Sequence, residues 1–381
     1  MTDEPTFADL PASLVSDVIA RTESVAQEIL STYHALGADQ SKLRSQLESS
    51  GLLLHESSFD LPVACTTCGV DGSLAVERLL ATDLVACAAV AVEGLTPPSE
   101  TRHWEMPHHR CFLEAERHHE KTGTILRAIM MGYELQLALE APHDVVMFDG
   151  SLTLPVIYFN PALSAASEAR ELKTAQHFIE SAIESLYAYG QILQCTRADR
   201  QFVGMPKYTT HREIGQLLGW DEAHDDRGLL SSLLRPGELT KPQRLHQPDQ
   251  EWHLNALIAL GTRSSQAEEL FEIARSALAR VHILYYRPAE WMPALRVELP
   301  AAVAQTPARL ATVLAALKQQ CAAPGMFEPY PLYMADRMVK SLSRSVLTFR
   351  QIATQNIAES YEGDIAEVFF GMHGYRTESG R

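Results

Sequence analysis

The tetrapeptide Asp-Gly-Ser-Leu occurs twice in this chain, each time directly after apolar residues. The first copy begins at Asp71 in CGVDGSL, and the second begins at Asp149 in VVMFDGSL. Short apolar runs bounded by turn residues are typical of buried strands, and a glycine after the aspartate permits a tight turn and the close approach of a ligand. The repeat therefore predicts two buried strands that each end at a carboxylate on the rim of a sheet.

Two such aspartates suit a shared divalent cation. If their strands are neighbours, Asp71 and Asp149 converge at one sheet edge, and hard ions such as Mg²⁺ and Mn²⁺ prefer carboxylate oxygens. The alternative is that Asp-Gly-Ser is ordinary turn chemistry, because these residues are abundant in turns. The repetition of all four residues after apolar runs favours the metal site.

The hydrophobic pattern predicts an α/β fold in which a mixed sheet is flanked by helices. Strand patterns precede both aspartates, while residues 110–139 read as one uninterrupted helix. Residues 10–54 predict one or two amphipathic helices. We therefore expect an N-terminal helical extension over residues 1–58 and one domain over residues 59–381. A polar region of about 215–255 is inserted in that domain.

Composition and targeting signals exclude several classes. The formal net charge of -16 argues against a generally basic surface that coats nucleic acid, although a local basic groove can exist on an acidic protein. The N-terminus has no signal-peptide pattern, and the longest apolar run, LVACAAVAV, is too short to span a bilayer. These features predict a cytoplasmic protein without a membrane segment. Cys65 and Cys68 lack the second pair that a zinc site needs.

Three further acids could complete a carboxylate site. Glu134 lies in the apolar stretch IMMGYELQLALE, where a carboxylate costs free energy unless it is exposed or paired. Glu140 is the competing choice, but its place at the helix end before APHD favours a solvated residue. Asp336, near the start of a long amphipathic helix, either binds metal or gains from the helix dipole.

Basic residues that could hold phosphate lie in two places. Lys207 follows a predicted strand in VGMPKYT. Three more recur at helical spacing on one face, as a phosphate-facing ridge requires, although such a face is usually only solvated. These three are Arg337, Lys340 and Arg344. Four histidines form no H-E-x-x-H motif and are predicted to be surface residues: His108, His109, His118 and His119.

Taken in order, these motifs resemble those of the NurA nuclease family. The resemblance rests on GVDGSL, an acid-bearing helix, VVMFDGSL, FVGMPKYT, RVELP and PYPLYMADRMVKSLS, from about Val63 to Ala353. No single motif is very specific, but their order and spacing together are. The resemblance implies a ribonuclease H-like fold with a carboxylate cluster that binds Mn²⁺ and cleaves DNA, so Mn²⁺ or Mg²⁺ is the expected cofactor.

The resemblance also implies site residues. Asp71 and Asp149 match the two aspartates of the family's DGS motifs, and Glu134 best matches the acidic helix position between them. Lys207 matches the lysine after the middle strand. These acids, together with Asp336, are the expected metal ligands, and Lys207 is the expected stabiliser of charge during hydrolysis.

The C-terminal motif departs from the family pattern. Tyr330 and Pro331 match its Tyr-Pro pair, but the archaeal members then carry an Ala-His pair where this chain has Asp336. This departure leaves open whether Asp336 binds metal directly or only caps its helix. Tyr330 is expected to stack on a base or to position the strand.

Partners follow from the resemblance as well. Members of the family form dimers that dock on the hexameric HerA translocase in DNA end resection, and bacterial pairs can serve in antiphage defence. DNA, a HerA-type hexameric ATPase and a second copy are therefore the expected partners. The chain has no Walker A pattern, so ATP hydrolysis must come from a partner.

The expected activity is metal-assisted phosphodiester hydrolysis, with one ion or two ions about 4 Å apart. The alternative is a catalytically weak structural adaptor that dimerises and docks on the ATPase. The presence of Asp71, Glu134 and Asp149 disfavours a decayed site and hence the adaptor.

Overall fold

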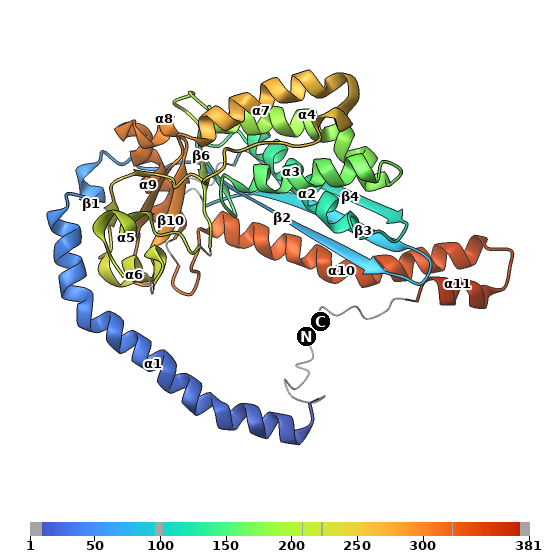
Figure 1. The fold of residues 1–381 in the computed structure, drawn as a ribbon, viewed down its shortest axis with the longest axis horizontal. Helices are drawn as coiled ribbons and strands as arrows, with labels where there is room; N and C mark the ends of the chain where they lie inside the picture. Colours follow the sequence, from blue (N-terminus) through green and yellow to red (C-terminus); the bar gives the residue numbers. More distant parts are fainter. Residues whose placement is uncertain (1–9, 96–101, 208, 222–223, 322, 374–381) are drawn as a thin grey trace.

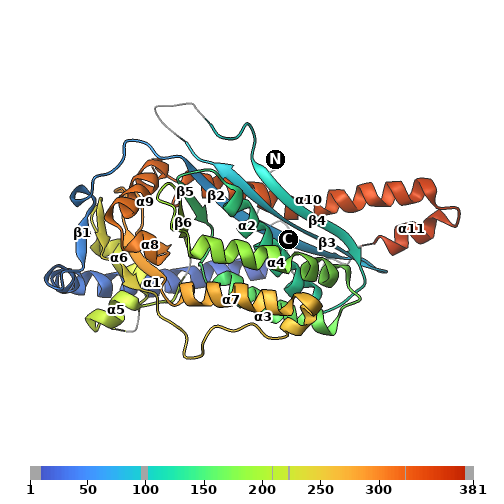
Figure 2. The ribbon, with the colours of Figure 1, turned by 90° about the horizontal axis from the view of Figure 1, so that it is seen from above.

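A ten-stranded mixed sheet forms the centre of the molecule (Figures 1 and 2). The computed structural model describes residues 10–95, 102–207, 209–221, 224–321 and 323–373, without the side chains of residues 32–38 and 343. Among these residues, the strand order is β1-β7-β9-β10-β6-β5-β2-β3-β4, and β8 pairs with β9. The predicted mixed α/β sheet is confirmed.

One half of the sheet combines antiparallel and parallel strands. Three long strands form an antiparallel meander: β2 (Thr67–Arg78), β3 (Asp83–Glu93) and β4 (His108–Glu116). Two short strands, β5 (Val145–Phe148) and β6 (Gln201–Gly204), then run parallel to β2. All four residues of β5 are buried, as expected of a central parallel strand that is covered on both faces.

The other half of the sheet is antiparallel. It contains β1 (Leu53–His55), β7 (Glu238–Thr240), β8 (Gln243–Arg244), β9 (His282–Tyr286) and β10 (Leu295–Leu299). β10 joins the two halves, because Glu298 pairs with Gly204 of β6.

Helices cover both faces of the sheet. Val146 and Phe148 of β5 belong to a core shared with α2, α3, α4 and α7, whereas Val145 and Met147 belong to a second core shared with α9 and α10. This alternation is what the period of two in a strand produces. The covering helices are α2 (Thr122–Glu140), α3 (Leu154–Glu168), α4 (Lys173–Leu193), α7 (Ser264–Leu278), α9 (Pro307–Gln320) and α10 (Tyr330–Ser360).

The N-terminal helix α1 (Ala12–Ser49) is one continuous helix and extends away from the sheet (Figure 1). Only its C-terminal part is anchored, through the buried Leu47 and an ion pair between Arg44 and Glu238. Near this part of α1 lie α5 (Glu213–Leu218) and α6 (Asp226–Leu233). The predicted N-terminal helical extension is therefore present, while its division from the rest at residue 58 stays a prediction.

The far end of α10 and the short helix α11 (Ile365–Gly371) form a second projection (Figure 2). The remaining short helices connect larger elements: η1 (Glu56–Ser58), η2 (Leu257–Arg263) and α8 (Ala301–Ala304). No helix among the described residues has both the length and the apolarity to cross a membrane.

The structure corrects the helix predicted over residues 110–139. Residues 108–116 instead form the edge strand β4, whose register places Cys111 opposite Ala88 of β3, and α2 begins only at Thr122. Pairing with β3 satisfies the backbone of this segment, and its side chains alternate between the two faces of the sheet. Tertiary pairing therefore overrides the local helical pattern.

Candidate functional site

Three aspartates from distant parts of the chain meet at one edge of the sheet. Asp71, Asp149 and Asp336 each place one carboxylate oxygen within 4.8 Å of the others, the only such group of three found among the described residues. Val70 of β2 lies opposite Phe148 of β5, so Asp71, the next residue of β2, lies beside Asp149, the first residue after β5. The two DGSL aspartates thus belong to neighbouring strands of the sheet, Asp71 within β2 and Asp149 directly after β5.

The two DGSL copies adopt different structures, which corrects the expectation that both end a strand. β2 continues through the first copy to Arg78, and Gly72 stays paired with Ala89. β5 does end before the second copy, where Gly150 has a φ of 145° in the region that favours glycine. The second copy is therefore a turn that leaves the sheet, and the first lies within a strand.

Gly72 instead permits the close approach of an acid. A Cβ atom at this position would lie 2.4 Å from Oε1 of Glu134 and 2.6 Å from Cγ of Met130. Glu134 is only 3% exposed and lines a small cavity with Asp149. Glu134 approaches from α2, whereas Asp336 comes from α10 on the opposite face of the sheet. Glu134 does not belong to the group of three aspartates.

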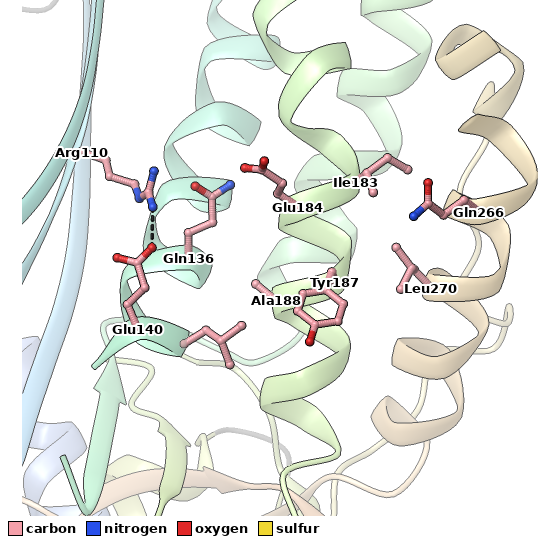
Figure 3. Close-up of a pocket in the computed structure, with 10 residues that line it drawn as sticks. Arg110, Gln136, Glu140, Ile183, Glu184, Tyr187, Ala188, Gln266 and Leu270 are labelled. Carbon is pink, nitrogen blue, oxygen red and sulfur yellow. Dashed lines mark hydrogen bonds and ion pairs between the residues drawn. The ribbon is translucent and has the colours of Figure 1, made fainter. Parts of the chain in front are cut away.

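Glu140, the competing acid of α2, lies elsewhere. Its carboxylate pairs with Arg110 at 2.5 Å and is half exposed. Figure 3 shows this pair at the wall of a cavity of about 320 Å³ between α2, α4 and α7. Among the two acids that the sequence left open, only Glu134 is therefore close to the aspartates.

Asp336 does not cap its helix. The N-cap of α10 is Pro329, and no side chain caps the helix there, while Asp336 lies beyond the first turn. The start of α10 is pressed against β2, because a Cβ atom on Gly69 would lie 2.5 Å from the backbone of Pro331 and Leu332. This close packing brings the Asp336 carboxylate to the edge where Asp71 and Asp149 meet.

Lys207 places a positive charge among these acids. Its Nζ atom lies 2.7 Å from Asp149, 2.8 Å from Glu328 and 3.8 Å from Asp336. Burial alone would lower the pKa of Lys207, but its ion pairs with Asp149 and Glu328 outweigh burial and raise the pKa. The amine is therefore firmly protonated.

Glu328 is the acid that the sequence analysis missed. It lies just before α10 in the segment FEPYP, and burial raises the pKa of its carboxyl group. The only local signal was an acid two positions before the Tyr-Pro pair. Nothing in that pattern indicates that the segment folds back onto Lys207.

The acids outnumber the cations that neutralise them. Burial, followed by repulsion from Asp149, raises the pKa of Asp71 to about 8. Burial also raises the pKa of Asp149 and raises that of Glu134 well above its ordinary value. A cluster of buried carboxylates that hold protons in this way is suited to a hard divalent cation, which would replace those protons.

The predicted phosphate-binding residues lie along α10. Lys340 pairs with Asp336 at 2.8 Å, and the guanidinium group of Arg337 lies 5.6 Å from the ring centre of Tyr333. Arg344 is exposed farther along the helix, and Tyr330 is its first residue. Of these four side chains, Lys340 alone forms an ion pair with one of the three aspartates among the described residues. Three of the predicted surface histidines, His108, His109 and His118, are exposed, and His119 is half-buried.

A family comparison identifies the chain. The sequence model of the NurA domain matches residues 65–341, which include all of the acids described above. The chain belongs to the NurA domain family. The resemblance inferred from the ordered motifs is confirmed.

Solved NurA structures share the fold of this family member. The NurA nuclease from Sulfolobus solfataricus is 13% identical, the alignment covers 93% of this chain and 99% of that chain, and the TM-score is 0.57. A NurA structure with manganese is 13% identical over 86% of this chain and 96% of that chain, with a TM-score of 0.52. No curated protein sequence matches this chain significantly.

Proposed function

We propose that this NurA family member is a metal-dependent nuclease that hydrolyses phosphodiester bonds in DNA. The observation that carries the proposal is the meeting of Asp71, Asp149 and Asp336 within 4.8 Å, beside the Lys207 amine. The family context supports it, because one solved relative is described as a nuclease and another was solved with manganese.

Mn²⁺ is the proposed cofactor, with Mg²⁺ as the substitute. Both ions take carboxylate oxygens, and the three aspartates offer such atoms from three rigid elements. Glu134 would complete the site from the face of α2. When bound, the metal would activate a water molecule and offset negative charge on the leaving oxygen.

The residues of the chain have separate tasks in this proposal. Lys207, held by Asp149 and Glu328, stabilises negative charge on the phosphoryl oxygens. Tyr330 stacks on a base or positions the strand, since it begins the helix that carries Asp336. The ridge of basic residues on α10 binds the phosphates that lead to the site: Arg337, Lys340 and Arg344.

The proposed partners are a second copy of the chain and a HerA-type hexameric ATPase, in DNA end processing or antiphage defence in the cytoplasm. Both projections of the molecule expose large apolar side chains, which suits helices that dock on other proteins. On α1 these include Leu14, Val18, Ile19, Val25 and Ile29; at the other end they include Leu347, Ile352, Ile365, Phe369 and Phe370.

The test is cleavage of end-labelled linear DNA in Mn²⁺, with and without the ATPase. Asp149→Asn should lower the cleavage rate by at least about 100-fold because it removes a charged ligand of the proposed metal ion, and Lys207→Met should do so because it removes the cation that stabilises the reacting phosphate. Glu134→Gln should also lose activity, whereas Glu140→Gln on the same helix should cleave like the wild type.

Folding of every variant is checked by circular dichroism and thermal unfolding. If the folded variants cleave as fast as the wild type, the acids are not catalytic. If the wild type itself does not cleave DNA even with the ATPase, the chain is an adaptor and the nuclease proposal is wrong.

A further inference from the structure

The RVELP motif of β10 contains two buried charges that the proposed reaction does not use. Arg296 and Glu298 are each 1% exposed, although both lie in a strand whose other residues are apolar. A buried charge costs several kcal/mol in effective desolvation unless partners compensate for it. The partners of these two residues therefore indicate what the motif does.

Glu298 binds the turn that follows Asp149. One of its carboxylate oxygens accepts hydrogen bonds from the Ser151 hydroxyl at 2.7 Å and from the Leu152 backbone N–H at 2.9 Å. On the other side of the turn, the Tyr189 hydroxyl donates to the Leu152 carbonyl at 2.6 Å. The second DGSL copy is thus held from two elements, β10 and α4.

Close packing against β6 leaves this turn little room to move. Gly204 is the residue of β6 that pairs with Glu298, and a Cβ atom on it would lie 2.9 Å from the Gly150 carbonyl oxygen. The same atom would lie 3.1 Å from the Leu152 nitrogen. The turn therefore rests directly on the end of β6, which lies next to the strand that ends before Asp149.

Arg296 contacts the other carboxylate oxygen of Glu298, the one that does not bind the turn. Its Nε atom lies 3.4 Å from Glu298, and its two terminal nitrogens each donate to Glu213 of α5 at 2.7 Å. The Tyr285 hydroxyl accepts a further hydrogen bond at 2.9 Å. Such a bidentate pair fixes the guanidinium plane.

We infer that Glu298 is a positioning residue that holds the Asp149 carboxylate in place for the metal ion, with Arg296 and Glu213 keeping Glu298 in its orientation. Glu298 contacts the backbone that carries Asp149 and does not itself belong to the group of three aspartates. This inference rests on the proposed metal site. Outer residues that orient a metal ligand change metal affinity by about 10- to 100-fold when they are removed.

The test is Mn²⁺ titration of the purified full-length chain, with free Mn²⁺ followed by electron paramagnetic resonance. Glu298→Gln should raise the dissociation constant by about tenfold or more, as expected for a residue that orients a ligand. Ser151→Ala should raise it by a smaller factor, because the Leu152 N–H still donates to Glu298. This second variant removes only a partly buried hydroxyl and keeps the test valid if Glu298→Gln fails to fold.

Glu56→Gln is the matched control. Glu56 is also buried and pairs with Lys318 and Tyr286 on the other half of the sheet, so its variant should bind Mn²⁺ like the wild type. If both site variants bind Mn²⁺ like the wild type, the positioning role is overturned. If the wild type does not bind Mn²⁺ at all, the proposed metal site fails first, and the two failures are thereby distinguished.

Discussion

At its buried position, the ionised carboxylate of Asp71 is unfavourable unless a cation lies near it. Burial and the neighbouring Asp149 raise the pKa of its carboxyl group to about 8, from an ordinary value of 3.8. In the folded protein without metal, this group therefore keeps its proton over a range of pH in which the unfolded chain has lost it.

This shift predicts how stability depends on pH. Because the folded pKa is raised, the contribution of Asp71 to stability is fully present below about pH 4 and is lost as the pH rises through about 8. Asp71→Asn, which cannot ionise, should flatten this fall in the metal-free protein. Urea unfolding in EDTA at pH 5 and pH 8 measures it.

The exposed acid Asp60 provides the control for this measurement, since Asp60→Asn should leave the fall between the two pH values as it is in the wild type. If the free energy of unfolding changes by the same amount between pH 5 and pH 8 in the wild type and in both variants, Asp71 is not protonated in the folded protein.

At the scale of elements, the local hydrophobic pattern predicted the strands that are buried on both faces. β5 was found from its four apolar residues, because a central parallel strand has no polar face. β4 was missed, because an edge strand with one solvated face has a mixed pattern, and its pairing with β3 is a long-range property.

The site was predictable to the same extent. Asp71 and Asp149 were found because apolar residues of a strand precede each of them, although β2 continues past Asp71, and Lys207 was found because it follows β6. Glu328 was not found, because its segment has no periodicity and reaches Lys207 only through the packing of α10 on β2. That packing depends on Gly69, whose role is visible only in three dimensions.

The contact between β2 and α2 yields a prediction at Gly72. Gly72→Ala places a Cβ atom in the space of the Glu134 carboxylate and Met130, so unfolding should become easier by about 1–3 kcal/mol, as in other overpacked cores. Mn²⁺-dependent cleavage should fall as Glu134 is displaced. Urea unfolding and the cleavage assay measure the two effects.

Gly123, in the first turn of α2, is the matched control. A Cβ atom there meets nothing within 4 Å, so Gly123→Ala should be neutral or stabilise the helix by up to about 1 kcal/mol. Equal effects of the two substitutions would mean that the contact between Gly72 and Glu134 does not matter.

On the scale of the whole molecule, the partly buried site contrasts with two exposed helical projections. Large apolar side chains on α1 are about half exposed, among them Val18 at 53% and Ile19 at 62%. In the proposed assembly they are covered by a second copy or by the ATPase. In the isolated chain these exposed side chains add no hydrophobic stabilisation, because they remain in contact with water.

Acidic substitutions at Val18 and Ile19 of α1 should therefore weaken association without destabilising the fold. Val18→Glu with Ile19→Glu should abolish the dimer or the complex with the ATPase while the unfolding free energy stays within about 0.5 kcal/mol of the wild type for each substitution. Sedimentation velocity measures the assembly. The control, Glu23→Gln on the same helix, should assemble normally; an unchanged assembly in the double variant would exclude α1 as the interface.

Anomalous diffraction from crystals soaked in MnCl₂, measured at the manganese absorption edge, would show directly whether the three aspartates bind a metal ion. We expect a peak within bonding distance of Asp71, Asp149 and Asp336, and we expect that peak to disappear in crystals of the Asp149→Asn variant. Crystals that show Mn²⁺ only at other positions, with these three carboxylates unliganded, would mean that the aspartates do not form the metal site.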